Sequence, residues 1–491
     1  MAFFQLSSPD LSNLSLGGAV LRLLESYGFT ADERYLVVRG TYTDDGDPSF
    51  GLHYSFWLFD LQAREYVSNF NEQIAGVDNA REIEVSDIQI SGTSGNLFAV
   101  ALVETKGTDE TRLVSLDNGQ VVSNNLIHSV SGDQVDTKVE RFLLSDDGRF
   151  LAIQTSSEQL SAEDAPDTND SSDIYLLDLQ NNSITRISYV GGSEVTDPTY
   201  LQDIHVVGDT VKIAFVTDAA FVSPSKIDLN SKNINAEANL RSDAYVWSSV
   251  FDHDGLTGSF TFDLLSLDSD SKAAGFVDRD NSVQITDAGS VFTSSAENIT
   301  EDDINESNDT IFIDNQGQIE RIVFGPNNEL DNGSVFVSAS ENGRFISYLS
   351  SSSEVSGNTG AQQLVVYDRQ LNTTEVVSQS GQLANNWVID GTMSPSGYSA
   401  AFTSSADNLT EEPLEATAGG LFVSLSDSIP ISGHVYHWRS HELIIDVTLG
   451  LSEQFNGVSS ELGSTTTDAV GEFTLSNNVV GEKMITAAKE M

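Results

Sequence analysis

Two acidic loops contain the residues best suited to chemistry in this chain. Both follow the pattern Asp-x-Asn-x-x-x-Asp, and their members are Asp167, Asn169 and Asp173 in the first loop and Asp303, Asn305 and Asp309 in the second. Carboxylate and amide oxygens at alternating positions of one loop can converge on a hard cation, so we predict Ca²⁺ binding at both loops. Neither loop is an EF-hand, because the glycine and the distal glutamate of that motif are absent. An Asx-rich turn that hydrogen-bonds its own backbone is the alternative.

A second group of possible metal ligands lies near the C-terminal end, where His434, His437 and His441 are three of only seven histidines. Imidazoles bind Zn²⁺ or Cu²⁺. On a strand, however, His434 and His437 would point to opposite faces. We therefore favour a structural role, in which the histidines line an interdomain surface and Tyr436 and Trp438 pack beside them.

Recognised catalytic motifs are absent from the sequence. Asp252-His253-Asp254-Gly255 could act as an acid–base pair, but Asp-Gly is also an ordinary hairpin turn. There is no G-x-S-x-G elbow, no Walker loop and no G-x-G-x-x-G followed by a helix. We predict neither catalytic nor cofactor-binding residues, although paired carboxylates for glycoside cleavage remain open among so many acids.

The charge of the chain limits its partners. Its 491 residues include 74 Asp and Glu against 23 Lys and Arg, for a net charge of −51. Such a field repels nucleic acid and anionic membranes and attracts hard cations, so we predict no nucleic-acid partner. A surface charged for solubility is the alternative reason. No apolar run reaches the roughly 18 residues that span a bilayer, so we predict no membrane insertion. The absence of cysteine excludes disulfides and thiolate sites.

The acidic loops belong to a unit that recurs along the chain. In residues 142–188 the unit consists of the turn Ser145-Asp146-Asp147-Gly148-Arg149, an apolar strand, a long acidic loop and two further strands. Comparable units begin near residues 29, 88, 211, 290, 340 and 394. Short strands in near-regular units, without helical patterns between them, indicate an all-β fold, a β-propeller of about seven four-stranded blades. Six or eight blades remain open, and separate sandwiches would need longer units.

The seventh unit ends before its fourth strand, because a different pattern begins at Pro430. The apolar segment of residues 2–6 precedes the first unit and is free to supply that strand. We therefore predict that the N-terminal strand closes the last blade. In the fourth unit, we interpret residues 252–255 as an insertion.

The motif S-x-[DN]-G-R-F, its SS-x-x-N-L continuation and a later strand that ends in Asp resemble the TolB-type propeller repeats of bacterial proteins. From Ile431 onward, S-G-x-V at 432–435 and T-D-x-x-G-x-F at 467–473 resemble carboxypeptidase-regulatory-like, immunoglobulin-like β-sandwich modules of bacterial surface proteins. The YHWRSH segment is also similar to segments of large acidic exoproteins. The resemblance implies a propeller over residues 1–428 and a small β-sandwich over residues 429–491.

From these features we expect a non-catalytic extracellular or cell-surface protein, a calcium-stabilised scaffold for binding and adhesion whose propeller loops hold a protein or glycan partner. The N-terminal stretch lacks the basic and apolar regions of a Sec signal peptide, so we expect export by another route, such as type I secretion. A self-associating surface-layer or filament subunit is one alternative. A propeller hydrolase or lyase that acts on polysaccharide is the other.

Overall fold

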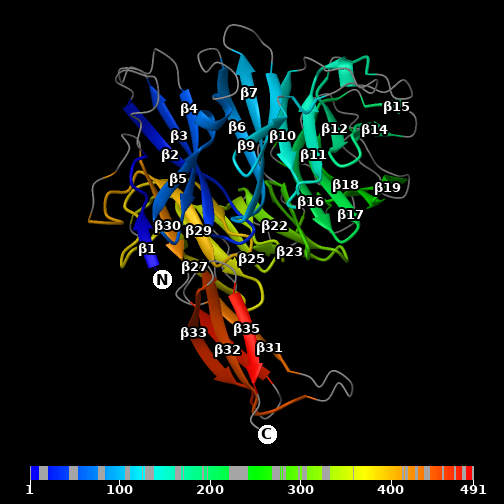
Figure 1. The fold of residues 1–491 in the computed structure, drawn as a ribbon. Helices are drawn as coiled ribbons and strands as arrows, with labels where there is room; N and C mark the ends of the chain where they lie inside the picture. The colour runs from blue at the N-terminus through cyan, green and yellow to red at the C-terminus, as the bar shows by residue number, and fades with distance from the viewer. Residues whose placement is uncertain are drawn as a thin grey trace.

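The computed structural model describes most of the chain, namely residues 2–9, 20–43, 53–75, 83–105, 111–123, 125–127, 138–160, 167–169, 171–190, 193–195, 197–219, 242–267, 277, 279, 283–296, 299–300, 307–322, 332–357, 359–411, 414, 419–425, 429–435, 443–455, 458–468, 472–477 and 483–488. Seven four-stranded antiparallel sheets are arranged in a ring, and the C-terminal strands lie below them in Figure 1. Seven blades were predicted, and seven are present.

Each blade runs from an inner to an outer strand. Blades 1 to 3 consist of β2 (Val20–Phe29), β3 (Tyr35–Thr43), β4 (His53–Asp60) and β5 (Glu65–Asn69); of β6 (Ile83–Thr93), β7 (Asn96–Thr105), β8 (Thr111–Asp117) and β9 (Gln120–Ser123); and of β10 (Val139–Leu144), β11 (Phe150–Thr155), β12 (Asp173–Asp178) and β13 (Ser183–Arg186). Short elements join some of the blades: α1 (Phe70–Ala75), a 3₁₀ turn (Glu158–Leu160), β14 (Tyr189–Val190) and β15 (Ser193–Glu194).

The remaining blades have the same order. Blades 4 to 6 consist of β16 (Thr199–Val207), β17 (Thr210–Thr217), β18 (Asp243–Asp252) and β19 (Gly255–Leu264); of β20 (Val283–Thr286), β21 (Gly289–Ser294), β22 (Asp309–Asp314) and β23 (Ile319–Ile322); and of β24 (Val335–Ala339), β25 (Phe345–Ser350), β26 (Gln363–Asp368) and β27 (Thr373–Val376), with α2 (Ser353–Ser356) between β25 and β26. Blade 7 consists of β28 (Val388–Met393), β29 (Ser399–Ser404), β30 (Gly420–Leu425) and β1 (Ala2–Gln5).

Blade 7 confirms the predicted closure. Strand β1 pairs antiparallel with β30, with Ala2 opposite Leu425 and Gln5 opposite Phe422. The ring of Phe3 stacks on that of Phe422, with centroids 5.8 Å apart. The first and last strands of the propeller therefore share one sheet, so the blade cannot form without both ends of the ring.

The cores lie between blades rather than within them. In β11, all six residues are buried, because a middle strand has a neighbouring blade on each face. In the outer strand β13 of the same sheet, only Arg186 is buried, and the other three residues are exposed or half-buried. Seven apolar clusters occupy the seven gaps between adjacent blades, including the gap between blades 7 and 1. Removing one blade would therefore expose two cores.

In blades 1, 3 and 6 the repeated turn motif holds the inner hairpin to the end of the third strand. In blade 3, Ser145 Oγ donates to Asp147 and accepts from the Phe150 amide at 2.9 Å, while Arg149 pairs with Asp178 at 2.8 Å. Gly148 has φ of 71°, a conformation that favours glycine. The same arginine–aspartate pair recurs as Arg34–Asp60 in blade 1 and as Arg344–Asp368 in blade 6. The S-x-[DN]-G-R-F motif is therefore a structural device of the hairpin.

One feature of the fourth unit differs from the prediction. Residues 252–255 are not an insertion, because Asp252 pairs with Gly255 and the segment is the turn between β18 and β19. These two strands are each ten residues long, longer than the outer two strands of the other blades. The extra length increased the spacing between the fourth and fifth units of the sequence.

The C-terminal strands form two small sheets. Strand β31 (Ile429–His434) pairs with β34 (Glu472–Asn477), and β32 (Thr448–Phe455) lies between β33 (Val458–Thr466) and β35 (Lys483–Ala488). Val447 and Leu449 are buried against a few partly buried apolar side chains. Among the described residues, no helix is long and apolar enough to cross a membrane.

Candidate functional site: the central channel

The inner strands of all seven blades surround a polar cavity of about 630 Å³. Its walls come from β2, β6, β10, β16, β20, β24 and β28. Six carboxylates line it, against two arginines and one histidine; the acids are Glu25, Asp87, Asp146, Asp203, Glu341 and Asp390, and the bases are Arg39, Arg141 and His205. A large cavity on which several polar groups converge is the first candidate for a ligand-binding site in a protein structure.

β-Bulges direct several of these side chains into the channel. Six of the seven inner strands shift register against their neighbour, and in five of them a shift directly precedes a polar residue that lines the cavity, namely Asp87, Arg141, Asp203, Ser338 and Asp390. A bulge places one extra residue in a strand, which bends it and re-aims the next side chain. The ring of polar groups is therefore built by the backbone of the inner strands.

Asp203 has a strongly perturbed carboxyl group on the channel wall. Its Oδ2 accepts a hydrogen bond of 2.6 Å from the Ile285 amide of blade 5. Burial raises its pKa to about 7, with a contribution from the charge of Asp146, while the Ile285 amide and His205 act in the opposite direction. The carboxyl group is thus close to half-protonated at neutral pH.

His205 lies in the same strand and bridges three blades. Its Nδ1 is 3.4 Å from Asp146 Oδ2 of blade 3, and its Nε2 is 3.1 Å from Asp287 Oδ1 of blade 5. Burial lowers its pKa, but Asp146, Asp203 and Asp287 together outweigh burial and raise the pKa to about 9. The imidazolium can donate to both carboxylates at once, because both ring nitrogens are then protonated.

Glu341 completes this acidic wall. Its pKa is raised, first by burial and then by the charges of Asp146 and Asp287. The wall formed by blades 3 to 6 therefore combines three carboxyl groups, those of Asp146, Asp203 and Glu341, with one histidine.

The wall formed by blades 1 to 3 differs in composition. Arg39 pairs with Glu25 at 2.8 Å and lies over the rings of Tyr27 and Tyr54. The Tyr27 hydroxyl donates to Asp87 Oδ1 at 2.5 Å. Burial raises the pKa of both Tyr27 and Asp87, so the phenol stays neutral and acts as a donor.

Arg141 is the second cation of this wall. It donates from Nη2 to the Gln202 carbonyl at 3.3 Å, and its charge lowers the pKa of Asp87. Asp390 of blade 7 lies nearby, and burial followed by the charge of Glu25 raises its pKa, while Arg39 lowers it.

The inner hairpins link every blade to the next. Six links, in order from blade 1 to blade 7, are Ala31 N to Gly92 O, Ser91 Oγ to Asp146 O, His205 to Asp146, His205 to Asp287, Asp287 N to Glu341 O, and Glu341 N to Pro395 O. The seventh runs from Ser396 N to Glu33 Oε1 at 2.6 Å and returns to blade 1. The channel mouth is therefore rimmed by a closed circuit of polar contacts.

The first predicted calcium loop faces a cation of the chain itself. Asp173 pairs with Arg186 and accepts from Ser188 Oγ, and Asp167 Oδ1 is 3.5 Å from Arg186. Asn169 donates to the Val195 carbonyl. The two carboxylates converge as the sequence predicted, but on a buried guanidinium. A Ca²⁺ ion would have to share them with Arg186, so calcium binding here stays a prediction.

The second loop is described only in part. Asp303 and Asn305 lie outside the described residues. Asp309 pairs with Arg321 at 3.3 Å, in the position where blade 3 has Asp173 and Arg186. Of the three C-terminal histidines, His434 is in β31, while His437 and His441 lie outside the described residues.

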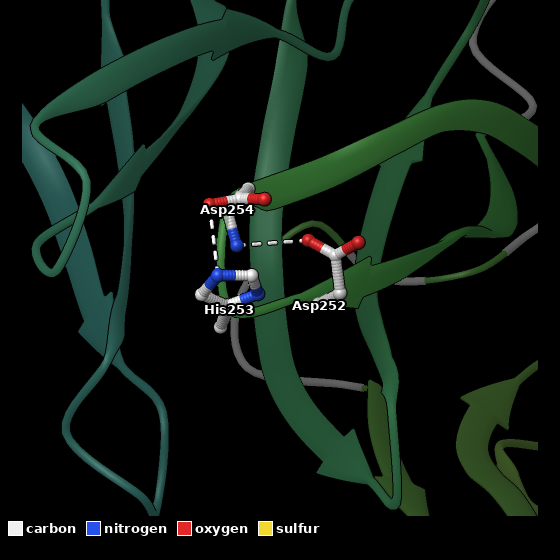
Figure 2. A group of neighbouring side chains, drawn as sticks. All are labelled: Asp252, His253 and Asp254. Carbon is white, nitrogen blue, oxygen red and sulfur yellow. Dashed lines mark hydrogen bonds and ion pairs between the residues drawn. The ribbon is translucent and has the colours of Figure 1, made fainter.

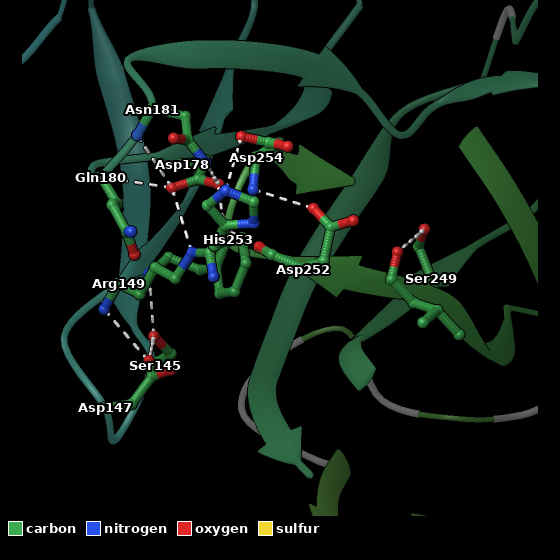
Figure 3. Close-up of polar contacts among 12 residues, drawn as sticks. Ser145, Asp147, Arg149, Asp178, Gln180, Asn181, Ser249, Asp252, His253 and Asp254 are labelled. Atoms are coloured by element: carbon green, nitrogen blue, oxygen red, sulfur yellow. Dashed lines mark hydrogen bonds and ion pairs between the residues drawn. The ribbon is translucent and has the colours of Figure 1, made fainter. Parts of the chain in front are cut away.

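Asp252, His253 and Asp254 are the one group in the described part of the chain whose ligand atoms lie within 4.8 Å of one another, and all three are exposed. Figure 2 shows His253 Nε2 near Asp254 Oδ1, 3.1 Å away, and the Asp254 amide donating to Asp252 Oδ1 at 2.8 Å. Figure 3 shows the hairpin beside blade 3, where Arg149 donates to the Asp252 carbonyl at 2.7 Å. The contacts are those of a tight turn that docks on its neighbour.

Sequence reasoning did not identify the channel residues. Their signal is a charged residue among the apolar residues of an inner strand, as with Asp87 in IEVSDIQI, Arg141 in VERFLL and Asp203 in TYLQDIHVV. Such a residue fits the ordinary alternation of polar and apolar residues in a half-buried strand, unless the strand is known to be the innermost of its blade.

No family model matches the sequence, and no curated protein matches it. Solved structures do resemble the fold. The β-propeller domain of the Trilobed protease from Pyrococcus furiosus matches with a TM-score of 0.47 at 9% identity, over 82% of this chain and 93% of that one. Prolyl oligopeptidase B from Galerina marginata matches with a TM-score of 0.42 at 9% identity, over 87% of this chain and 55% of that one.

The acylaminoacyl peptidase of Pyrococcus horikoshii matches with a TM-score of 0.37 at 10% identity, over 67% of this chain and 44% of that one. This chain spans about half the length of the acylaminoacyl peptidase and of prolyl oligopeptidase B. At such identity the likeness concerns the fold alone.

These solved structures give the expected scaffold function no support. A non-catalytic scaffold was predicted, whereas these propellers belong to peptidases. The prediction of a non-catalytic scaffold, which is not carried forward, took the absence of known catalytic motifs as its evidence. Inner-strand acids, which belong to no motif, were left out of that reasoning.

Proposed function

We propose that this protein is a hydrolase with its active site in the central channel and with Asp203 as the group that transfers the proton. The observation that carries this proposal is the position of Asp203 on the channel wall, with a pKa of about 7. A general acid or base works best when its pKa is near the working pH, and strongly perturbed carboxyl groups cluster at functional sites.

The two titratable groups of β16 have distinct protonation states at neutral pH. Asp203 is near its midpoint, whereas His205, with a pKa of about 9, stays cationic. Such a separation is typical of acid–base sites. In hydrolysis of an amide, the hydroxyl group of water bonds to the acyl carbon, the carbon–nitrogen bond breaks, and the other proton of water passes to the leaving amine. Asp203 would carry that proton, and His205 would hold Asp146 and Asp287 in place.

The charge of the channel supports a class of substrate. Six carboxylates against three basic groups favour a polar substrate that bears a positive charge. Uncharged glycans offer less to such a site.

A hydrolysis assay tests the proposal. We would compare small amides and peptides that have a free amino group with N-acetylated forms and with nitrophenyl glycosides. Turnover should favour the amines, and Asp203→Asn should reduce it at least about a hundredfold. Asp263→Asn is the matched control, since Asp263 is exposed on the outer strand of the same blade. Unchanged turnover in Asp203→Asn, or no turnover of any substrate, would contradict the proposal.

Several finer predictions from the sequence stay proposals. These are the TolB-type origin of the repeats, an immunoglobulin-like sandwich over residues 429–491, calcium in the acidic loops and an extracellular location. The sequence motifs and the net charge of −51 support them. A crystal structure of residues 429–491 and fractionation of the source cells would test the second and the last.

A further inference from the structure

The channel has two chemically different walls. Arg39 and Arg141 lie in blades 1 and 3, and both influence the pKa of Asp87. Asp203 and Glu341 lie in blades 4 and 6, and both respond to the charges of Asp146 and His205. One wall thus carries both guanidinium groups, beside the carboxyl groups of Glu25, Asp87 and Asp390, whereas the other carries carboxyl groups and His205 but no guanidinium.

We infer that the channel binds a small zwitterion, with the carboxylate of the ligand on the wall of Arg39 and Arg141 and its ammonium group on the wall of Asp203 and Glu341. This inference names the substrate class of the proposed hydrolase. The reaction rests on that proposed function, but the binding of a zwitterion does not. A guanidinium presents a planar fork that matches a carboxylate, and carboxylates accept charge-assisted hydrogen bonds from ammonium groups.

The size of the cavity fits such a ligand. About 630 Å³ lies within the usual range for small-molecule sites and suits an amino-acid derivative or a short peptide.

Both walls are held in position before a ligand arrives. Arg39 is clamped by Glu25 and by the rings of Tyr27 and Tyr54. The Ile285 amide holds the Asp203 carboxyl group, and the Glu341 backbone is fixed by its links to Asp287 and Pro395. Pre-organised groups lose little conformational entropy on binding, so each wall can discriminate between ligands by charge.

The experiment is calorimetric binding to the wild-type protein with ligands that contain no scissile bond. The zwitterions are 4-aminobutanoate, 6-aminohexanoate and 8-aminooctanoate, which cover a range of charge separations. For each, the alkylamine and the alkanoate of the same chain length lack one charge. At least one zwitterion should bind at least about tenfold more tightly than both of its singly charged partners, since one charge-assisted contact is worth about that factor. If no zwitterion exceeds its amine, the inference is overturned.

Two substitutions assign the walls. Arg141→Met should reduce the affinity for the zwitterion to that for the alkylamine. Glu341→Gln, which keeps the backbone links of that residue, should reduce it toward that for the alkanoate. Arg64→Met is the control and should change nothing, because Arg64 is an exposed arginine in the turn between β4 and β5. If both channel variants bind like the wild type, the assignment is wrong.

The same data separate this inference from the proposed function. Zwitterion binding without any turnover would contradict the hydrolase and leave the binding site. Turnover of amines with no preference for substrates that also bear a carboxylate would contradict the zwitterion inference but would leave the proposed hydrolase function standing.

Discussion

The Glu33 side chain accepts a hydrogen bond of 2.6 Å from the backbone amide of Ser396, a residue 363 positions further along the chain. At three other places in the ring, a backbone amide of one hairpin meets a carbonyl of the next, as between Glu341 and Pro395. Pro395 has no amide hydrogen, so blade 7 cannot donate in this way. Glu33, buried and with φ of 56°, supplies the missing link through its side chain.

Loss of that link should destabilise the ring. We expect Glu33→Ala to lower the free energy of unfolding by about 1–3 kcal/mol, because the Ser396 amide loses a charged acceptor in a buried place. Urea unfolding followed by fluorescence measures the change. The control is Glu65→Ala, which removes an exposed glutamate from the same blade. An equal effect of both substitutions would rule out the link as a stabilising contact.

The N-terminal strand should contribute to the stability of the whole propeller. Leu6 is 1% exposed and belongs to the core between blades 7 and 1. Leu6→Ala should cost about 2–5 kcal/mol, the usual range for a buried leucine. Leu371→Ala is the matched control, since Leu371 is 63% exposed. If Leu6→Ala unfolds like the wild type, β1 does not close the ring in solution.

The imidazolium of His205 should make stability depend on pH. Its pKa is about 9 in the native state against 6.5 in the unfolded chain. The stabilisation is therefore complete below about pH 6.5 and is lost as the pH rises through 9. Asp146, Asp203, Asp287 and Glu341 are the acids that face it. Melting temperatures between pH 6 and 10 should fall in the wild type and stay flatter in His205→Gln. Parallel curves would contradict this.

Asp203 should act in a lower window. Its native pKa of about 7 exceeds the unfolded value of 3.8, so the native state retains a proton that the unfolded state releases. Its contribution is therefore fully present below about pH 3.8 and is lost as the pH rises through 7. Asp203→Asn should stabilise the protein at pH 8 relative to the wild type and should flatten the profile between pH 4 and 7. A variant that is less stable at pH 8 would contradict the assigned direction of the pKa shift.

Calcium binding requires a separate test. The prediction demands that Ca²⁺, and not Mg²⁺, raise the unfolding temperature of the metal-stripped protein in a saturable way. The free energy of unfolding should rise by about 2.7 kcal/mol at a hundredfold excess over the dissociation constant. Asp309→Asn should then reduce the rise. An equal and weak response to both ions would mean that Arg186 and Arg321 already satisfy these carboxylates.

The repeats, the number of blades and the closing strand could be predicted from the sequence. These features depend on local patterns: a turn such as Ser145 to Arg149 followed by an apolar strand must form a hairpin, whatever lies next to it. A missing fourth strand and an apolar N-terminal segment leave one solution for closure. The local convergence of Asp167 and Asp173 was also visible, because both lie in one loop.

The nature of their partner and the location of the channel depended on the tertiary structure. Arg186 reaches Asp167 and Asp173 only because β13 lies beside β12 in the folded blade. Asp87, Arg141, Asp203 and Asp390 come from four blades and share no local motif. Closure of the ring brings them together, and burial then shifts the pKa of Asp203. A sequence states which residues can ionise, but their proton affinity is set by neighbours and by the exclusion of water, and both are properties of the assembled ring.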